Sequence, residues 1–559
     1  MLWSSPPSLP LPALFAMAAN METQQRAAEQ LDVEVIPGTE VMKDVGDVHF
    51  AHAGGASKGS VLVPQPSASP NDPLNWSLPW KLIVAISQLL YVWVLVCSAL
   101  SLAPLFPLLG AEFHLDQQQL SLLTGLNVIT LGFANIFIVP ISNIFGRRPT
   151  AIFFGFLVVL TNIWQALASS HQSLLAARAC NGIVAATSET IMVQTIADMF
   201  FLHERATWMA AYFTFYFSGA FLGPIMAGSI GSHHGWRSFF WLSTALSGFV
   251  TLLLVFCYPE TKYHRSNGIA NIKGESKDQS DVKEQVVDSE MNSQNDAASG
   301  TYLRKGRPSK GQFAPFQKPD NRWMSFIIRD LTTPVIVFFN PIVFWSACML
   351  MGPADLLLLF NLTESGIFGS PAYGWSPQTV GYSNFAFFVG GLFGVLTAGP
   401  LSDWWARRMT IKNNGVREAE MRLPALIPYC CFFVVSHVVG AVGYDRLWPW
   451  QAIIVCGFGF SGLAVTSIPA ISIAYAIDCY KPISGEIMIV GTVLKNVLGF
   501  CLSYWVFDIA ARNGWTTVFM IQFAVDMAPV LLTIPLYFYG KELRRWTKDS
   551  SLHRMETMI

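Results

Sequence analysis

Two ten-residue stretches decide the fold: "PISNIFGRRP" at residues 140–149 and "PLSDWWARRM" at residues 400–409. Aligned, they share a proline, a serine, an Asn or Asp, and a pair of arginines. They lie 260 positions apart in a chain of 559 residues, and each follows a long apolar run. A polar turn that occurs twice, about half a chain apart, predicts that the chain folds into two structurally similar halves.

The composition excludes an ordinary soluble protein. The chain is 52% hydrophobic and 13% charged, whereas soluble domains carry about 25% charged residues. A net charge of −1 predicts no nucleic-acid partner. The nine cysteines fall in or beside apolar runs, as buried thiols do, and their spacing predicts no metal site. No phosphate-binding loop is present, so we expect no nucleotide and no other cofactor.

Twelve apolar runs are long enough to cross a hydrocarbon layer about 30 Å thick, which takes about 20 helical residues. They lack the alternation of strands, and helices satisfy their own backbone polar groups in lipid. The sequence therefore predicts an all-α integral membrane protein with twelve transmembrane helices in two six-helix halves. The predicted spans are roughly 82–109, 119–141, 150–170, 173–198, 206–231, 238–258, 333–360, 376–400, 421–443, 448–478, 486–511 and 515–540.

Basic residues predict the orientation. With the N-terminus in the cytosol, the inner loops carry the arginine pairs at 147–148 and 407–408, whereas the outer loops carry only Arg237, Arg446 and Arg512. Lys and Arg concentrate on the cytosolic side of membrane proteins. We therefore expect both termini in the cytosol.

The polar segments predict the domain boundaries. Residues 264–332 and 1–70 are low in apolar content, so we expect most of each to be disordered, with a short interfacial helix near 320–330. The predicted order is an N-terminal tail (1–81), a first half (82–258), a linker (259–332), a second half (333–540) and a C-terminal tail (541–559).

The repeated turn resembles the loop motif of the major facilitator superfamily, Gly-x-x-x-Asp-x-x-Gly-x-Arg/Lys. The matching positions are Val139, Asn143, Gly146 and Arg148 in the first copy and Gly399, Asp403, Ala406 and Arg408 in the second. The resemblance implies gating loops formed by Asn143, Arg147, Arg148, Asp403, Arg407 and Arg408. In the family the acid of the first copy helps to lock the outward-facing state, and Asn143 lacks that charge.

Two further motifs narrow the resemblance. The fifth span contains "SGAFLGPIMAG", whose Gly219, Gly223, Pro224 and Gly228 resemble the family's antiporter motif; the alternative is close helix packing alone. In the fourth span, Arg178 and Gly182 resemble a motif associated with proton coupling.

Three longer stretches, 63–81, 415–426 and 474–500, are similar to the fungal twelve-span drug:proton antiporter group, near the branch for histidinol and polyamine transport. That branch includes importers of organic cations and efflux proteins. The resemblance implies a monomer in the plasma membrane that binds small molecules and protons.

Ionisable residues within spans are costly in lipid and indicate function. Glu189 lies near the middle of the fourth span, eleven residues after Arg178 and on nearly the same helical face. We predict that Glu189 carries protons or binds a cation, with Arg178 influencing it. The alternative is a structural hydrogen bond to a neighbouring helix.

Two other charged residues in the spans, Asp355 and Lys495, have two interpretations each. Asp355, predicted in the outer part of the seventh span, either attracts a cationic substrate or faces the outer vestibule. Lys495 either neutralises a carboxylate or reaches the cytosolic surface. Asp526 is expected to be structural, and Asp198 and Asp478 to pair with loop arginines. Aromatic candidates for lining a cavity are Phe213, Phe215, Tyr216, Trp345, Phe385, Phe387 and Phe388.

A glycosylation sequon begins at Asn361, in the predicted outer loop 361–375. We therefore predict that Asn361 carries a glycan. The alternative is that it lies too close to the membrane to be modified.

These observations predict a proton-coupled transporter that exports small organic molecules, since no motif for ATP is present. The alternative is an importer of polyamines or other organic cations. An enzyme is not expected, because only His437 of the ten histidines lies in a span, with no visible partner.

Overall fold

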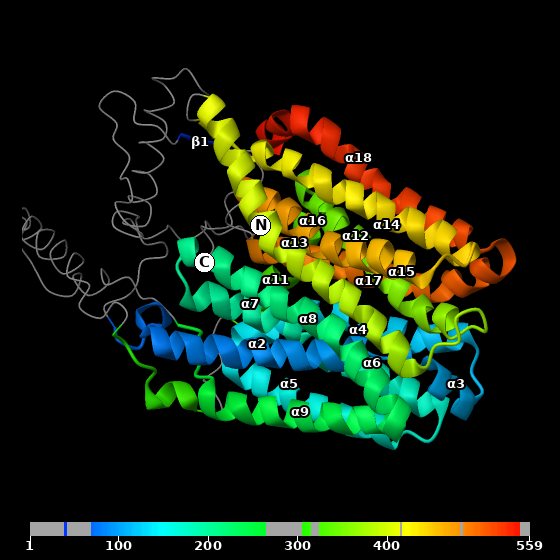
Figure 1. Ribbon diagram of the computed structural model, residues 1–559. Coiled ribbons are helices and arrows are strands. Elements are labelled where there is room, and N and C mark those ends of the chain that lie inside the picture. Colours follow the sequence, from blue (N-terminus) through cyan, green and yellow to red (C-terminus); the bar gives the residue numbers. More distant parts are fainter. Residues whose placement is uncertain are drawn as a thin grey trace, which may run out of the picture.

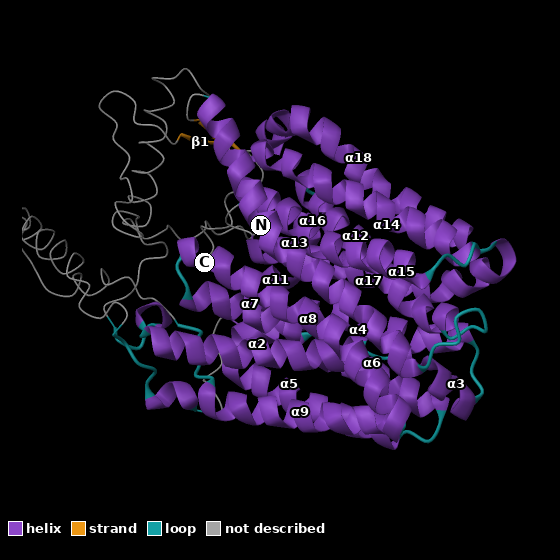
Figure 2. Ribbon diagram, viewed as in Figure 1, coloured by secondary structure: helices purple, strands orange, loops and turns teal. Residues whose placement is uncertain are grey.

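The computed structural model of the chain describes residues 39–41, 69–263, 305–314, 323–413, 416–480 and 484–547. Nearly every element in them is a helix, as Figure 2 shows. The remaining parts of the predicted tails and linker, at 1–38, 42–68, 264–304, 315–322 and 548–559, lie outside the described residues.

The first half is built from helices that follow one another with short turns. They are η1 (Pro73–Asn75), α2 (Leu78–Leu100), η2 (Ala103–Leu105), α3 (Phe106–Phe113), α4 (Gln117–Phe145), α5 (Arg147–Leu167), α6 (His171–Ala185), α7 (Thr187–Met199), α8 (Leu202–His234) and α9 (Trp236–Cys257).

The second half repeats this arrangement after the linker. Its helices are η3 (Lys310–Phe313), α11 (Trp323–Phe338), α12 (Pro341–Phe368), α13 (Pro377–Lys412), η4 (Ala419–Leu426), α14 (Ile427–Asp445), α15 (Trp450–Ala452), η5 (Ile453–Gly459), α16 (Phe460–Cys479), α17 (Ser484–Asn513) and α18 (Trp515–Thr547).

The prediction of an all-α membrane protein is confirmed. Eleven helices among the described residues are long and apolar enough to cross a membrane. The predicted fourth span, 173–198, is not one helix but two, because α6 ends at Ala185 and α7 begins at Thr187. The backbone N–H of Glu189 donates a hydrogen bond to the carbonyl of Ala186, three residues earlier, at 3.0 Å. This 3₁₀-type hydrogen bond closes the turn between the two helices. Together α6 and α7 form the twelfth span.

The predicted seventh span, 333–360, is displaced along the chain. Asn340 caps a new helix by accepting hydrogen bonds from the backbone N of Ile342 and Val343, and Pro341 suits the first helical position. Residues 333–338 therefore belong to α11, and α12 continues eight residues past the predicted end. The expected interfacial helix exists, but it is longer than predicted.

The two halves pack against each other through two helix pairs. Helix α13 packs along α8, and α17 packs along α4. Figure 1 shows the first half in blue to green on one side and α14 and α18 of the second half on the other. We call the end of the bundle with β1 and the last turn of α18 the terminal end. The opposite end, with α3 and the turn at 369–376, is the far end.

The far end is closed between the halves. The Ser365 hydroxyl donates to the Ala103 carbonyl. Gln118 donates to the Tyr504 carbonyl at 3.0 Å, and the Ser121 hydroxyl donates to the Ser503 carbonyl at 2.9 Å. All of these contacts join one half to the other.

A small ribbon fastens the N-terminal segment to the second half. Strand β1 (Thr39–Val41) pairs antiparallel with β2 (Val416–Glu418). Arg544, fully buried near the end of α18, forms ion pairs with Glu418 at 2.7 Å and Glu420 at 2.6 Å. Part of the predicted tail is therefore ordered.

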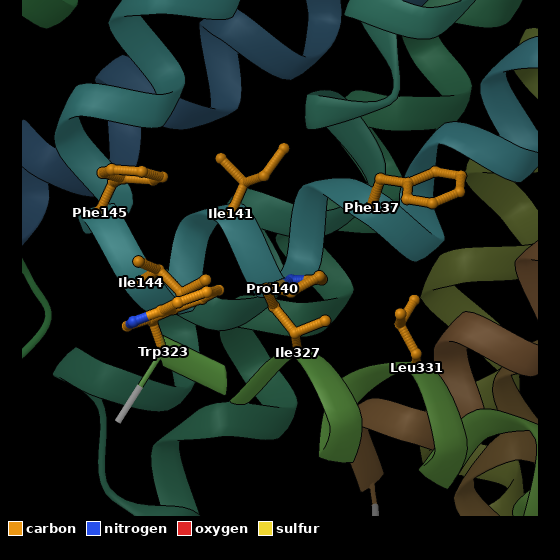
Figure 3. Close-up of a pocket in the computed structure, with 8 residues that line it drawn as sticks. All are labelled: Phe137, Pro140, Ile141, Ile144, Phe145, Trp323, Ile327 and Leu331. Carbon is orange, nitrogen blue, oxygen red and sulfur yellow. The ribbon is translucent and has the colours of Figure 1, made fainter. Parts of the chain in front are cut away.

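Helix α11 joins the halves at the terminal end, because it contacts both α4 and α17. Its contact with α4 leaves an apolar pocket of about 480 Å³ (Figure 3). The pocket is lined by Phe137, Pro140, Ile141, Ile144, Phe145, Trp323, Ile327 and Leu331. No charged side chain lines it, so it is separate from the polar site described next.

Candidate functional site

Glu189 lies at the centre of a polar cluster between the two halves. Its Oε1 accepts hydrogen bonds from the Tyr216 hydroxyl at 2.7 Å and from Lys495 Nζ at 2.9 Å. Its Oε2 accepts from Asn135 Nδ2 at 2.7 Å and, more weakly, from Asn496 Nδ2 at 3.4 Å. Helices α4, α7 and α8 of the first half and α17 of the second thus meet at one carboxylate.

The Glu189–Lys495 ion pair is largely shielded from solvent. The Glu189 side chain is 3% exposed and the Lys495 side chain 16%. Lys495 also donates to the Tyr216 hydroxyl at 3.1 Å and lies over its ring. Of the two interpretations of Lys495, the structure shows the one in which it neutralises a carboxylate.

The break in the fourth span helps to place this charge. Glu189 occupies the first turn of α7, where the helix N-terminus favours a negative charge. It lies ten residues from the end of α7 at Met199, or roughly 15 Å. That is half of a hydrocarbon layer of about 30 Å.

Small residues bring Lys495 and Asn496 within reach of Glu189. A Cβ at Gly132 of α4 would lie 2.6 Å from the Asn496 Cβ, and one at Gly125 would lie 2.6 Å from the Ser503 Cβ. Glycine at these positions lets the α4 and α17 backbones approach closely. The cluster depends on this approach.

The structure does not bring Arg178 to Glu189. Arg178 is fully buried and donates to the Leu123 carbonyl at 3.2 Å and the Ser98 carbonyl at 3.3 Å. It also donates to Gln165 at 3.4 Å. These partners tie α6 to α4, α2 and α5, and the eleven positions between Arg178 and Glu189 correspond to about 16 Å of helix. Arg178 is therefore placed to organise the first half.

Asp355 lies near Lys495 and not in the outer part of its span. It is buried at the middle of α12, and its charge acts on Lys495 and on Asp526. Its carboxylate lies 3.4 Å from where a Cβ at Gly499 would be, one turn along α17 from Lys495. Asp355 thus borders the same interface between the halves.

The structure contains a buried histidine–aspartate pair that the sequence did not predict. His437 Nε2 lies 3.0 Å from the Asp526 carboxylate, and both side chains are buried. Gln522 donates to the other Asp526 oxygen at 2.8 Å. The expectation that His437 has no partner is therefore wrong. The available signal was that both residues are ionisable and lie deep in spans.

The first arginine turn forms a dense network. Arg147 pairs with Asp198 at 3.1 Å and donates to Asn143 Oδ1 at 2.6 Å. Asn143 in turn donates to Asp330 of α11. Arg148 donates to carbonyls at the end of α9, including Val255 at 2.8 Å. Asn143 therefore joins the turn to α11 through a neutral amide.

Glu260 caps α5 from beyond α9. Its carboxylate accepts from the backbone N of Arg147 at 3.0 Å and of Arg148 at 3.2 Å. Burial raises the pKa of Glu260, although these hydrogen bonds and the Arg147 charge oppose the shift. Glu260, just after the last helix of the first half, therefore fixes the backbone of the first arginine turn.

The second turn uses a different arginine. Asp403 pairs with Arg422 at 2.8 Å, and Arg422 also pairs with Asp478 at 2.7 Å. Arg407 and Arg408 are exposed, and Arg408 lies over the Trp404 ring. The predicted pairing of Asp198 and Asp478 with loop arginines is confirmed, whereas Arg407 and Arg408 form no ion pair among the described residues.

The α8 motif packs against two helices. A Cβ at Gly219 would lie 2.7 Å from the Trp93 carbonyl oxygen of α2, and one at Gly223 would overlap Ser101. A Cβ at Gly228 would lie 2.5 Å from the Pro377 carbonyl oxygen, and Pro224 contacts Gly381 of α13. The motif therefore allows close contact within the first half and across to the second.

Asn361 is not in a loop. It is buried within α12, because the helix runs to Phe368. The predicted outer loop beginning at residue 361 is therefore wrong, and since a glycan needs an exposed asparagine, the burial favours the alternative that Asn361 is not modified.

A row of stacked phenylalanines lies beside the polar cluster. The rings of Phe213, Phe217, Phe221 and Phe387 follow one another with centroids 6.3, 6.0 and 5.8 Å apart, and Phe217 also contacts Tyr216. Of the other predicted aromatics, Phe385 is exposed and Trp345 donates to the Pro529 carbonyl at 2.9 Å.

Comparison with known proteins agrees with this architecture. The chain is 25% identical over 538 residues to the protein HOL1 of Saccharomyces cerevisiae, covering 88% of this chain and 91% of HOL1. It is 22% identical to the efflux pump radE of Floropilus chiversii, covering 85% and 83% of the two chains.

Its fold is similar to the solved structure of the proton:xylose symporter XylE, with a TM-score of 0.55 and 12% identity over 83% of this chain and 97% of that one. The family model of the Major Facilitator Superfamily matches residues 88–502, which is more than half of the chain. The chain is a multi-pass membrane transporter and not an enzyme, and it belongs to the Major Facilitator Superfamily.

Proposed function

We propose that the chain exports small organic molecules in exchange for protons, by alternating access between the two halves. The observation that carries the proposal is the Glu189–Lys495 ion pair, which joins α7 of the first half to α17 of the second at mid-depth. The relative named as an efflux pump supports the outward direction.

The ion pair supports a proton switch. Ionised Glu189 attracts Lys495 and accepts a hydrogen bond from Tyr216. A proton on Glu189 removes the attraction and leaves Lys495 free to move with the second half. Removing one partner of a buried pair typically costs about 3–5 kcal/mol, which is enough to bias two conformations of a transporter.

The basic residues of the turns support an orientation in the membrane. The terminal end carries the arginine turns at 147–148 and 407–408 and the last turn of α18, and such residues favour the cytosolic side. We therefore assign the terminal end to the cytosol and the far end to the outside of the plasma membrane.

The surroundings suggest a flat, apolar or weakly cationic substrate. The Phe213–Phe387 row offers aromatic faces next to Tyr216, and such faces bind apolar rings and cations. Lys495 already neutralises Glu189, so a substrate cation would have to compete with it.

Uptake of an organic cation is the second candidate. Asp355 is buried near Lys495 and forms no ion pair among the described residues. A carboxylate in that position would attract a polyamine or a similar cation from either side.

The test uses cells that lack their own efflux pumps. Accumulation of labelled polyamines and of a panel of toxic organic compounds is measured with and without a protonophore. The chain should lower accumulation, and both the protonophore and Glu189→Gln should abolish that effect. Asp508→Asn, which alters an exposed ion pair elsewhere in the bundle, is the control and should export normally. Higher polyamine accumulation would reject export and establish uptake.

A further inference from the structure

Glu364 is a buried carboxylate that the sequence analysis placed in a loop. It lies in α12, one residue before Ser365, and is fully buried. Its Oε2 accepts a hydrogen bond from Asn384 Nδ2 at 2.9 Å. Ser383 lies 3.4 Å from the same oxygen, but its hydroxyl also donates to the Val380 carbonyl at 2.6 Å. Thus one neutral amide is its main partner.

The second oxygen of Glu364 has no hydrogen-bond partner in the part of the chain that the structure describes. Among the described residues, Oε1 is buried without any hydrogen bond, and Glu364 forms no ion pair. A charged carboxylate in such a place loses its hydration with only the Asn384 hydrogen bond to offset the loss. A neutral carboxyl group loses far less.

Among the described residues, no cation on the helices packed around Glu364 pairs with it. Helix α14 contributes Tyr444, which interacts with both Glu364 and Tyr373 of the turn after α12. Helix α13 contributes Asn384 and Ser383. On α17 and α18, Lys495 and Asp526 interact with Asp355 instead, nine residues towards the terminal end. Arg512, near the end of α17, pairs with Asp508 of the same helix at 2.9 Å.

Glu364 also adjoins a contact that closes the far end. Ser365 donates to the Ala103 carbonyl of the first half. Gly366 lies beside Gln117, at the start of α4. When the halves separate at this end, the Ser365–Ala103 bond breaks and water gains access to the neighbouring carboxyl group.

We propose that Glu364 is a proton-binding site whose neutral form permits the far end to close. A proton from the solution at this end binds Glu364 while the end is open, and the neutral carboxyl group is then buried. Loss of the proton when the end reopens favours the open state. This site is distinct from Glu189. The proposal requires only that the chain alternates between open and closed far ends, so it holds for export or uptake.

The test measures access to the far end as a function of pH. Ser365→Cys in the full chain, reconstituted in lipid nanodiscs, reports opening through its reaction with a membrane-impermeant maleimide between pH 5 and 9. Each labelling rate is divided by the labelling rate of the double variant Ser365→Cys/Glu364→Gln at the same pH. Because both variants carry the same cysteine, the ratio cancels the pH dependence of the thiol itself. Labelling of the chain without Ser365→Cys is subtracted.

The ratio should rise at least about tenfold with pH, following a single titration. Glu364→Asp, which keeps a titrating group, should restore the pH dependence. Glu112→Gln, which removes an exposed carboxylate paired with Arg237 at the same end, should leave it intact. A flat ratio would overturn the proposal. If Glu189→Gln did not affect transport, the proposed proton-coupled export would be rejected, but the pH dependence of labelling would be unaffected. The two proposals can therefore be rejected independently.

Discussion

At the scale of residues, one largely buried ion pair lies where the halves meet. Glu189 and Lys495 are 306 positions apart in the chain but are joined by an ion pair of 2.9 Å. Asn135, Tyr216 and Asn496 supply the remaining hydrogen bonds to the carboxylate. The two charges therefore neutralise each other only while the two halves are together at this depth.

The pair can be tested by a double-mutant cycle. Lys495→Met leaves Glu189 buried without its cation, and we expect the free energy of unfolding to fall by about 3–5 kcal/mol. Glu189→Gln/Lys495→Met should cost much less than the two single changes added together. Unfolding is followed by thermal denaturation in detergent. Additive losses would show that the two residues do not interact.

Single residues show how far the sequence alone can lead. Glu189 could be chosen because a carboxylate in the middle of an apolar span is conspicuous. Its partner could not be chosen, because no local pattern links position 189 to position 495 across two halves. Glu364 was missed for another reason: the predicted end of the seventh span fell eight residues early, which moved a buried acid into a loop.

At the scale of elements, the closest helix approaches depend on glycine. The α4–α17 pair meets at Gly125 and Gly132, and the α8–α13 pair meets at Gly228 and Gly381. The hydropathy of the sequence predicted the helices, but not which faces meet. The interruption at Ala186 was also hidden, since α6 and α7 form one continuous apolar run in the sequence.

Gly132→Ala tests the approach of α4 to α17. The new Cβ would lie 2.6 Å from the Asn496 Cβ, which cannot move without its backbone. We expect a loss of about 1–3 kcal/mol in unfolding free energy, together with weaker transport. Gly248→Ala in α9 is the matched control, because its Cβ would meet nothing within 4 Å. Equal thermal stability of the two variants would contradict this account.

The β1–β2 ribbon makes a prediction about pH. Burial raises the pKa of Glu418, but hydrogen bonds from Arg544, Thr39 and Lys541 outweigh it and hold the pKa below its ordinary value of 4.5. The ionised group binds fewer protons in the folded state, so its stabilisation is present above that value and is lost as the pH falls through the folded pKa.

Glu418→Gln should therefore lower the unfolding temperature at pH 7, with a loss of about 1–3 kcal/mol expected for a charged hydrogen bond. The difference from the unaltered chain should narrow as the pH falls below about 4.5. Glu542→Gln, in a surface pair with Arg545, should show no measurable difference at either pH. A constant difference across this range would contradict the prediction.

At the scale of the whole molecule, the connection between the halves is more than a tether. Helix α11 contacts α4 and α17, and Asp330 on it accepts the hydrogen bond from Asn143. Asn143 lacks the acid of the family motif, but the carboxylate of Asp330 approaches the same position from the predicted linker. No local pattern in the sequence predicts that approach.

The variant Asn143→Asp tests whether Asp330 supplies the carboxylate that the motif lacks at position 143. It places a second carboxylate against Asp330, and Arg147 can offset only part of the repulsion. We expect slower transport and a loss of about 1–3 kcal/mol in unfolding free energy, because a charged hydrogen bond is lost. Adding Asp330→Asn should restore both, since the amide and the carboxylate have only changed places. Asp330→Asn alone should have a smaller effect. No rescue by the double change would reject the role of this contact.

The position of α11 has a mechanical consequence for the transport cycle. A helix of 16 residues is about 24 Å long and does not stretch. When the terminal end opens, α4 and α17 move apart, and the helix that bridges them must release one of the two. Under the alternating access proposed above, this contact is therefore broken and re-formed in each transport cycle. Part of the free energy that drives the proposed cycle is then spent on the connection between the halves, outside the two bundles.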